Sequence, residues 1–118
     1  MIVEQRTYRV KLGKIPEFLK AVEIIGLPVM RQTLGGLIGY FVTEVGPLNE
    51  VVHLWAYESL DDRARRRETC AAQPDWEKFL ATVRPLFEHM ETRVMTPASF
   101  TPITLEQIRA LNRGGQAA

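Results

Sequence analysis

The order in which strand-like and helix-like segments follow one another is the feature that most constrains the fold of this chain. Four short runs alternate apolar and polar residues and are rich in β-branched and aromatic side chains, which is typical of strands. Two longer stretches space their apolar residues by three or four, which predicts amphipathic helices. In chain order, we expect strands at residues 2–10, 37–45, 51–57 and 89–96, a first helix at 14–31, and a second helical region at 60–72 and 74–87.

This β-α-β-β-α-β order predicts an α+β fold of the ferredoxin-like type. In that fold a four-stranded antiparallel sheet carries both helical crossovers on one face, and its other face is free of helices. The strand at 51–57 should then lie between the strands at 2–10 and 37–45. Pro28 should kink or end the first helix, because proline cannot donate a backbone hydrogen bond. Ser59 with Asp62 three residues later resembles a capping box, which would start the second helical region.

The chain is long enough for one domain and a short extension. It has 118 residues, of which 46% are hydrophobic and 25% charged, a normal mixture for one globular core. We expect the domain at residues 1–100 and a C-terminal extension at 101–118. Thr104 and Gln107 form a second capping box, so a short helix is expected from there through Leu111. Residues 114–118 are expected to fray.

The charge balance and the cysteine content limit the kinds of partner and cofactor that we expect. Fifteen Lys and Arg residues balance fourteen Asp and Glu residues, so we expect no nucleic-acid partner. The arginine run at residues 63–67 is predicted to be a solvated helix face. Cys70 is the only cysteine and cannot form an intrachain disulfide. His53 and His89 offer no zinc spacing, and no phosphate loop is present, so no metal and no cofactor are expected.

The apolar runs are too short for a membrane span, which needs about 20 residues. The first four residues, Met1-Ile2-Val3-Glu4, are already charged and do not resemble the start of a signal peptide. We therefore expect no membrane insertion and a cytoplasmic location.

The strands divide their side chains into two chemically different faces. In the strand at 51–57, Val52, Leu54 and Ala56 share one face, which is expected to pack under the helices. The opposite face is expected to be free of helices, and it collects aromatic and charged side chains: Glu4, Arg6, Tyr8, Tyr40, His53, Trp55 and Tyr57. A large aromatic patch normally marks an interface or a pocket. A second copy of the chain is the simplest cover, which predicts a homodimer, with a higher oligomer as the alternative.

Two readings of the charged members of this face stay open. Glu4 and Arg6 are more often a structural ion pair, and a lone histidine such as His53 is more often a hydrogen-bonded structural residue. If neither Glu4 nor Glu44 neutralises Arg6, a small anionic ligand becomes its natural partner. The predicted ligand-binding residues are Glu4, Arg6, Tyr8, Tyr40, Glu44, His53, Trp55 and Tyr57. A partly enclosed cavity lined by six of them, Arg6, Tyr8, Tyr40, His53, Trp55 and Tyr57, is expected between the sheet and the helices or between subunits. The alternative is a filled interface with Arg6 paired internally. In an enzyme, His53 would be the candidate general base, and Arg6 would stabilise developing negative charge.

The chain also resembles a known family. The residues that carry the resemblance are Glu4, Arg6 and Tyr8, then Gly13-Lys14, Gly39-Tyr40-Phe41, Thr43-Glu44, Gly46, Asn49, Val52-His53-Leu54-Trp55, Tyr57, Asp62-Arg63, Pro74 and Trp76. In these positions residues 1–100 resemble the NIPSNAP family, within the wider group of dimeric α/β barrels. The resemblance implies a ferredoxin-like subunit whose sheet pairs face to face with the sheet of a second subunit.

Three functions are compatible with these features. The first is a homodimeric NIPSNAP-like protein of unknown activity that binds a small organic ligand. In its most specific form, this hypothesis makes the ligand an aromatic anion. The second is a cofactor-independent monooxygenase or isomerase that uses the same pocket. The third is a structural or adaptor dimer without a ligand. A cavity with convergent polar groups would favour the first two, and a closed, filled face would favour the third.

Overall fold

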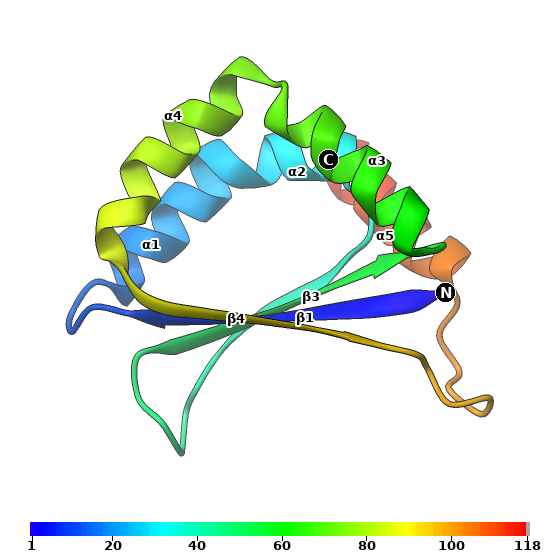
Figure 1. Cartoon of the computed structure of the whole chain (residues 1–118), viewed down its shortest axis with the longest axis horizontal. Coiled ribbons are helices and arrows are strands. Elements are labelled where there is room, and N and C mark those ends of the chain that lie inside the picture. Colours follow the sequence, from blue (N-terminus) through cyan, green and yellow to red (C-terminus); the bar gives the residue numbers. More distant parts are fainter. Residues whose placement is uncertain (118) are drawn as a thin grey trace.

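The computed structural model of the chain describes residues 1–117 and has the predicted order of elements (Figure 1). The elements are β1 (Ile2–Val10), α1 (Ile15–Ala21), the π-turn η1 (Val22–Gly26), α2 (Leu27–Thr33), β2 (Leu37–Val42), β3 (Glu50–Tyr57), α3 (Leu60–Ala71), α4 (Pro74–Val83), the 3₁₀ turn η2 (Arg84–Leu86), β4 (Phe87–Met95) and α5 (Leu105–Ala117).

The four strands form one antiparallel sheet in the order β2-β3-β1-β4. Helices α1 to α4 arch over one face of this sheet, as Figure 1 shows. The predicted ferredoxin-like α+β fold is therefore confirmed. The predicted neighbours of β3 are confirmed as well.

The first crossover is bent where proline predicts it. The backbone N–H of Leu27 donates to the carbonyl of Val22, five residues back, so the helix widens by one residue just before Pro28. Proline has no N–H for the usual helical bond, and a widened turn is one way to absorb it. Gly26 lies at this bend, and a Cβ there would stand 2.7 Å from the ring of Phe79. The bend thus lets α4 pack closely against the first crossover.

The second crossover begins at the predicted cap. The Ser59 hydroxyl accepts a hydrogen bond from the Asp62 N–H at 3.1 Å, and the Asp62 carboxylate accepts one from the Glu58 N–H at 2.9 Å. Two backbone donors at the start of α3 are satisfied by this exchange. Arg66 and Arg109 also contact the Asp62 carboxylate, at 2.9 and 3.2 Å. Burial alone would raise the pKa of Asp62, but the Glu58 N–H and the arginines outweigh it and lower that pKa.

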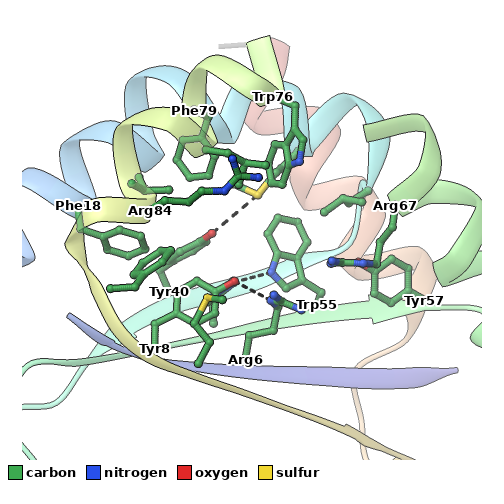
Figure 2. Close-up of a pocket in the computed structure, with 17 residues that line it drawn as sticks. Arg6, Tyr8, Phe18, Tyr40, Trp55, Tyr57, Arg67, Trp76, Phe79 and Arg84 are labelled. Carbon is green, nitrogen blue, oxygen red and sulfur yellow. Dashed lines mark hydrogen bonds between the residues drawn. The ribbon is translucent and has the colours of Figure 1, made fainter. Parts of the chain in front are cut away.

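The sheet presents the opposite face to the helices from the one expected. Trp55 and Tyr57 point up toward the helices (Figure 2), and Glu4 and His53 are buried with them. The side chains expected under the helices, Val52, Leu54 and Ala56, belong to the other face. The prediction was wrong because it treated charge as a sign of exposure. The large aromatic rings pack under the helices, and a partner on α3 neutralises the charge of Glu4.

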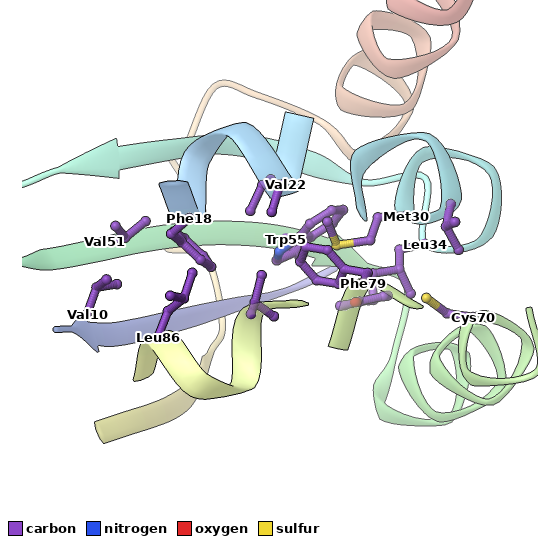
Figure 3. Packing of buried hydrophobic residues seen from close by; sticks show 14 residues of the cluster. Val10, Phe18, Val22, Met30, Leu34, Val51, Trp55, Cys70, Phe79 and Leu86 are labelled. Carbon is purple, nitrogen blue, oxygen red and sulfur yellow. The ribbon is translucent and has the colours of Figure 1, made fainter. Parts of the chain in front are cut away.

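The core lies between the aromatic face and the helices (Figure 3). Trp55 of β3, Phe18 of α1 and Phe79 of α4 are almost completely buried in it. Cys70 of α3 belongs to the same cluster and is a free thiol, whose pKa burial raises. The aromatic side chains of the sheet therefore serve as core residues first, and they leave no room for a second subunit on that face.

The C-terminal extension contains a longer helix than expected. The predicted capping box is present, since Thr104 and Gln107 exchange hydrogen bonds of 2.9 and 3.1 Å. The helix α5 then continues past the expected end at Leu111 to Ala117, and Ala118 lies outside the described residues. Asn112 donates to the Leu37 carbonyl at 3.0 Å, which ties α5 to the start of β2.

Gly36 gives a test of this packing. A Cβ at Gly36 would stand 2.1 Å from the backbone oxygen of Ala56, so the loop before β2 cannot keep its place beside β3 if that atom is added. We expect Gly36→Ala to destabilise the fold by about 2 kcal/mol or more, as overpacked sites do. The matched control is Gly114→Ala on α5, where nothing lies within 4 Å. Chemical denaturation should separate the two variants, and equal midpoints would contradict the close approach at Gly36.

Candidate functional site

A partly enclosed cavity of about 270 Å³ lies between the aromatic face of the sheet and the helices (Figure 2). Six of the eight predicted site residues line it: Arg6, Tyr8, Tyr40, His53, Trp55 and Tyr57. The helices contribute Phe18, Met30, Trp76, Phe79 and Leu80 among others. The walls are thus mostly aromatic, with polar groups at a few positions.

The other two predicted residues lie elsewhere. Glu44 is exposed in the loop between β2 and β3 and does not line the cavity. Glu4 is fully buried in the sheet beside the cavity, where it neutralises Arg6 from below. Glu44 was included because it alternates onto the right face of a strand predicted to run to residue 45, whereas β2 ends at Val42.

Glu4 is the centre of a buried ion network. Its Oε2 accepts hydrogen bonds from Arg63 of α3 at 2.6 and 3.1 Å and from Arg6 at 3.3 Å. Arg6 also donates from Nε to the Tyr8 hydroxyl at 2.8 Å. Burial alone would lower the pKa of Arg6, but Tyr8 and Glu4 outweigh it and raise that pKa. The predicted structural ion pair is therefore present, with Arg63 as a third member that the sequence reading missed.

His53 is held in one orientation by its neighbours. The ring of Tyr40 stacks parallel to it at 4.4 Å, and the ring of Tyr8 meets it edge-on at 4.7 Å. The indole N–H of Trp55 donates to His53 Nδ1 at 2.7 Å. A neutral imidazole that accepts at Nδ1 carries its proton on Nε2. His53 Nε2 is buried and has no hydrogen-bond partner within residues 1–117.

The surroundings of His53 oppose its protonation. Burial is the main cause, and the positive charges of Arg6 and Arg67 add to it, so the pKa of His53 falls to about 3. His53 is therefore neutral at neutral pH, and its basic nitrogen is already occupied by Trp55. This arrangement suits hydrogen-bond donation from Nε2 better than the general-base role considered from the sequence.

Tyr57 is the second residue of the cavity lining, after His53, that has a buried polar atom without a partner. Its side chain is fully buried, and its hydroxyl has no hydrogen-bond partner in the described part of the chain. Burial, with a contribution from the charge of Glu4, raises the pKa of Tyr57 to about 12, so the phenol keeps its proton. The hydroxyl remains available to a group that enters the cavity.

Two arginines of the cavity were not recognised in the sequence. Arg67 of α3 and Arg84 of η2 both line it, and neither has an ion-pair partner among residues 1–117. Arg67 follows Arg63 by one helical turn, so both belong on the face of α3 that also buries Cys70. That spacing was the available signal, and it shows that the expectation of a wholly solvated arginine run was wrong. No comparable signal marks Arg84.

These features define a small ferredoxin-like subunit with an aromatic, positively charged cavity under its helices. The NIPSNAP family model matches residues 3–102, and the chain belongs to the NIPSNAP family. It is 34% identical over 94 residues to the NipSnap homolog of Dictyostelium discoideum, which covers 80% of this chain and 41% of that protein. The chain thus spans less than half the length of this curated relative.

Solved structures agree on the fold. A NIPSNAP family protein of unknown function from Agrobacterium tumefaciens is 50% identical, with a TM-score of 0.84 over 88% of this chain and 94% of that one. A candidate antibiotic biosynthesis monooxygenase from Nitrosomonas europaea is 19% identical, with a TM-score of 0.62 over 82% of this chain and 98% of that one. The second likeness concerns the fold alone.

Two further properties concern the described residues as a whole. No helix within residues 1–117 combines the length and apolarity needed to cross a membrane. In the same residues, no group of three or more His, Cys, Asp and Glu side chains is arranged to hold a metal ion.

The depressed pKa of His53 predicts a pH dependence of stability. The unfolded chain binds a proton at this histidine below about pH 6.5, whereas the folded chain does not until about pH 3. Between these values the unfolded state binds more protons, so the contribution of His53 is complete above pH 6.5 and is lost as the pH falls. The slope should approach about 1.4 kcal/mol per pH unit below pH 6.

Denaturation midpoints between pH 4.5 and 7.5 test this. His53→Gln should remove the slope that His53 contributes, and the control His89→Gln, at an exposed position on β4, should keep it. An unchanged pH profile in His53→Gln would show that His53 is not held neutral by the fold.

Proposed function

We propose that this NIPSNAP protein binds a small, flat organic anion in the cavity between its sheet and its helices. The observation that carries the proposal is the pair Arg67 and Arg84. Both line an aromatic cavity, and neither has an ion-pair partner among residues 1–117. A carboxylate or a related anion is the group that a guanidinium binds best.

The charge balance of the cavity supports an anion. Glu4 is the carboxylate that contacts Arg6, and it is shared with Arg63. The negative charge of Glu4 is therefore already matched by two positive charges, and none remains for Arg67 or Arg84. Positive charge near low-dielectric walls attracts anions more strongly than the same charge in water.

The volume of the cavity and the residues of its walls favour a flat ligand. Ligand sites usually enclose about 300–1,000 Å³, and this cavity of about 270 Å³ is at the small end. One or two fused rings would fit such a space. Tyr8, Tyr40 and Trp76 present ring faces and edges, which pack well against another aromatic ring.

Intrinsic fluorescence gives a direct binding test, because both tryptophans of the chain, Trp55 and Trp76, line the cavity. We expect 2-naphthoate to change this fluorescence saturably and neutral 2-naphthalenemethanol to bind at least tenfold more weakly. Arg67→Met removes a half-buried guanidinium and should weaken 2-naphthoate binding by about tenfold. Arg84→Met removes an exposed guanidinium and should weaken it less.

The control is Arg93→Met on β4, which is exposed on the helix-free side of the sheet. It should bind 2-naphthoate as the unchanged protein does. Equal binding of the acid and the alcohol, or equal binding in all three variants, would contradict an anion site in the cavity.

The rival functions fit this cavity less well. A cofactor-independent isomerase needs a base, and the occupied Nδ1 and low pKa of His53 leave the candidate base unsuited to that role. A purely structural dimer gives no account of partly enclosed space lined by unpaired cations. Binding without a defined reaction is therefore the function that the geometry supports best.

We propose that the protein is a homodimer, through a different face from the one first expected. Helices α1 to α4 cover the aromatic face (Figure 1). On the opposite face, Ile103 and Ile108 of the C-terminal segment lie beside Val3 and Leu54, and the rest of that face is left for a partner. That face carries apolar side chains near its centre and charges around them: Val3, Ile38, Phe41, Val52, Leu54 and Met95, with Arg9, Glu50, Glu91 and Arg93. Phe41 is 52% exposed in the single subunit, and burial of such rings favours association.

A charge placed at the centre of this face tests the dimer. Leu54→Glu should convert the dimer to a folded monomer, because two copies of the carboxylate would be buried close to each other. Ile24→Glu, on the exposed side of the helical layer, should leave the dimer intact. Sedimentation velocity at micromolar concentration measures both, with circular dichroism as the check on folding. A monomeric unchanged protein would refute the proposal.

A further inference from the structure

The polar atoms of the cavity lining that lack partners are mainly hydrogen donors, whereas Glu4 Oε1, buried beside the cavity, is an acceptor without a partner in the described residues. Arg67 and Arg84 can only donate. His53 Nε2 is buried and has no partner in residues 1–117, and the same holds for the Tyr57 hydroxyl. A phenol can donate or accept, so the nitrogen groups decide the polarity of the site.

Trp55 determines which nitrogen of His53 carries the proton. An indole N–H is a donor and never an acceptor. The 2.7 Å contact between Trp55 Nε1 and His53 Nδ1 therefore requires an unprotonated Nδ1. A ring flip would place a carbon atom against the indole N–H, and it would also have to occur between Tyr40 and Tyr8, which enclose the ring at 4.4 and 4.7 Å. His53 is thus locked as a neutral imidazole with an N–H at Nε2.

An N–H donor that is buried without an acceptor lowers the stability of the folded protein. Such a group in a native cavity needs an explanation, and a ligand acceptor supplies one. Nε2 is buried and His53 lines the cavity, so an acceptor would reach Nε2 through the cavity. The positive charges of Arg6 and Arg67 act on His53 as well, so an electron-rich oxygen is the acceptor they favour.

We infer that His53 is a fixed N–H donor of the ligand site and not a base, and that the site selects an anion that also carries a carbonyl or enolate oxygen. The inference rests on the proposed function for its ligand and on the Trp55 contact for the state of His53. The anionic group would be held by the arginines, and the second oxygen would accept from His53 Nε2. A ligand with an amine or ammonium group in that position would place donor against donor.

The state of His53 can be measured without any ligand. Long-range ¹H–¹⁵N NMR of the labelled protein distinguishes the two imidazole nitrogens, and the chain has only two histidines. We expect His53, assigned by His53→Gln, to show a protonated Nε2 and an unprotonated Nδ1 that do not titrate between pH 5 and 8. A proton on Nδ1, or titration of His53 in this range, would overturn the inference.

Two matched acids test the ligand. Chromone-2-carboxylate and 2-naphthoate are both flat two-ring carboxylates, and only the first has a ketone oxygen. The unchanged protein should bind chromone-2-carboxylate about tenfold more tightly, the effect of satisfying one buried donor. His53→Leu should abolish the preference. His53→Gln should keep it, because its amide oxygen can accept from Trp55 while its N–H donates into the cavity.

The outcomes separate the two claims. Equal affinity of the unchanged protein for both acids, or a preference that persists in His53→Leu, would overturn the selection by His53 and leave the anion site standing. If neither acid binds, the proposed function fails and the ligand part of the inference fails with it. The NMR measurement then still decides whether His53 is the locked donor.

Discussion

The buried carboxylate of Glu4 is the interaction on which the rest of this structure depends. It lies in β1 at the base of the helical layer and accepts two hydrogen bonds from Arg63 of α3. A buried carboxylate without such a partner would cost several kcal/mol, so the sheet and α3 must stay together. With Arg63 fixed on Glu4, the next turn of α3 brings Arg67 to the cavity, and Arg66 reaches the carbonyls at the end of α2. One carboxylate thereby orients a run of arginines with different roles.

The sequence allowed the fold to be predicted but not the orientation of its sheet. Alternation along β1 and β3 correctly grouped Glu4, Arg6, His53 and Trp55 on one face, because strand geometry fixes which residues share a face. It carries no information on which face the helices cover. That choice depends on the pairing of Glu4 with Arg63, 59 residues away, and on aromatic rings that fill the core. The alternation along each strand therefore predicts which side chains share a face of the sheet, whereas contacts between distant residues determine whether the helices cover that face.

The part of the candidate site that the strands contribute could be predicted from the sequence. Its six sheet residues follow from alternation and strand order, whereas its helical wall depends on how each crossover bends. The π-turn before Pro28 and the contact of Gly26 with Phe79 place α4 over the sheet, and neither the widened turn nor that contact can be read from apolar spacing. Arg84 lies in the short turn after α4, where no periodicity applies. Arg67 could have been found from its spacing to Arg63, had the acidic partner in β1 been recognised.

The composition of the cavity itself argues that its space is used. Empty volume and unpaired buried donors each lower stability, and this chain combines both at one place. Larger apolar side chains at the wall could remove the empty volume, and an acceptor from the chain could satisfy His53, as Trp55 is satisfied by His53 Nδ1. The helices instead add Arg67 and Arg84 without carboxylates opposite them in the described residues. A small flat anion with oxygen acceptors would occupy the cavity, accept a hydrogen bond from His53 and bring negative charge to the arginines.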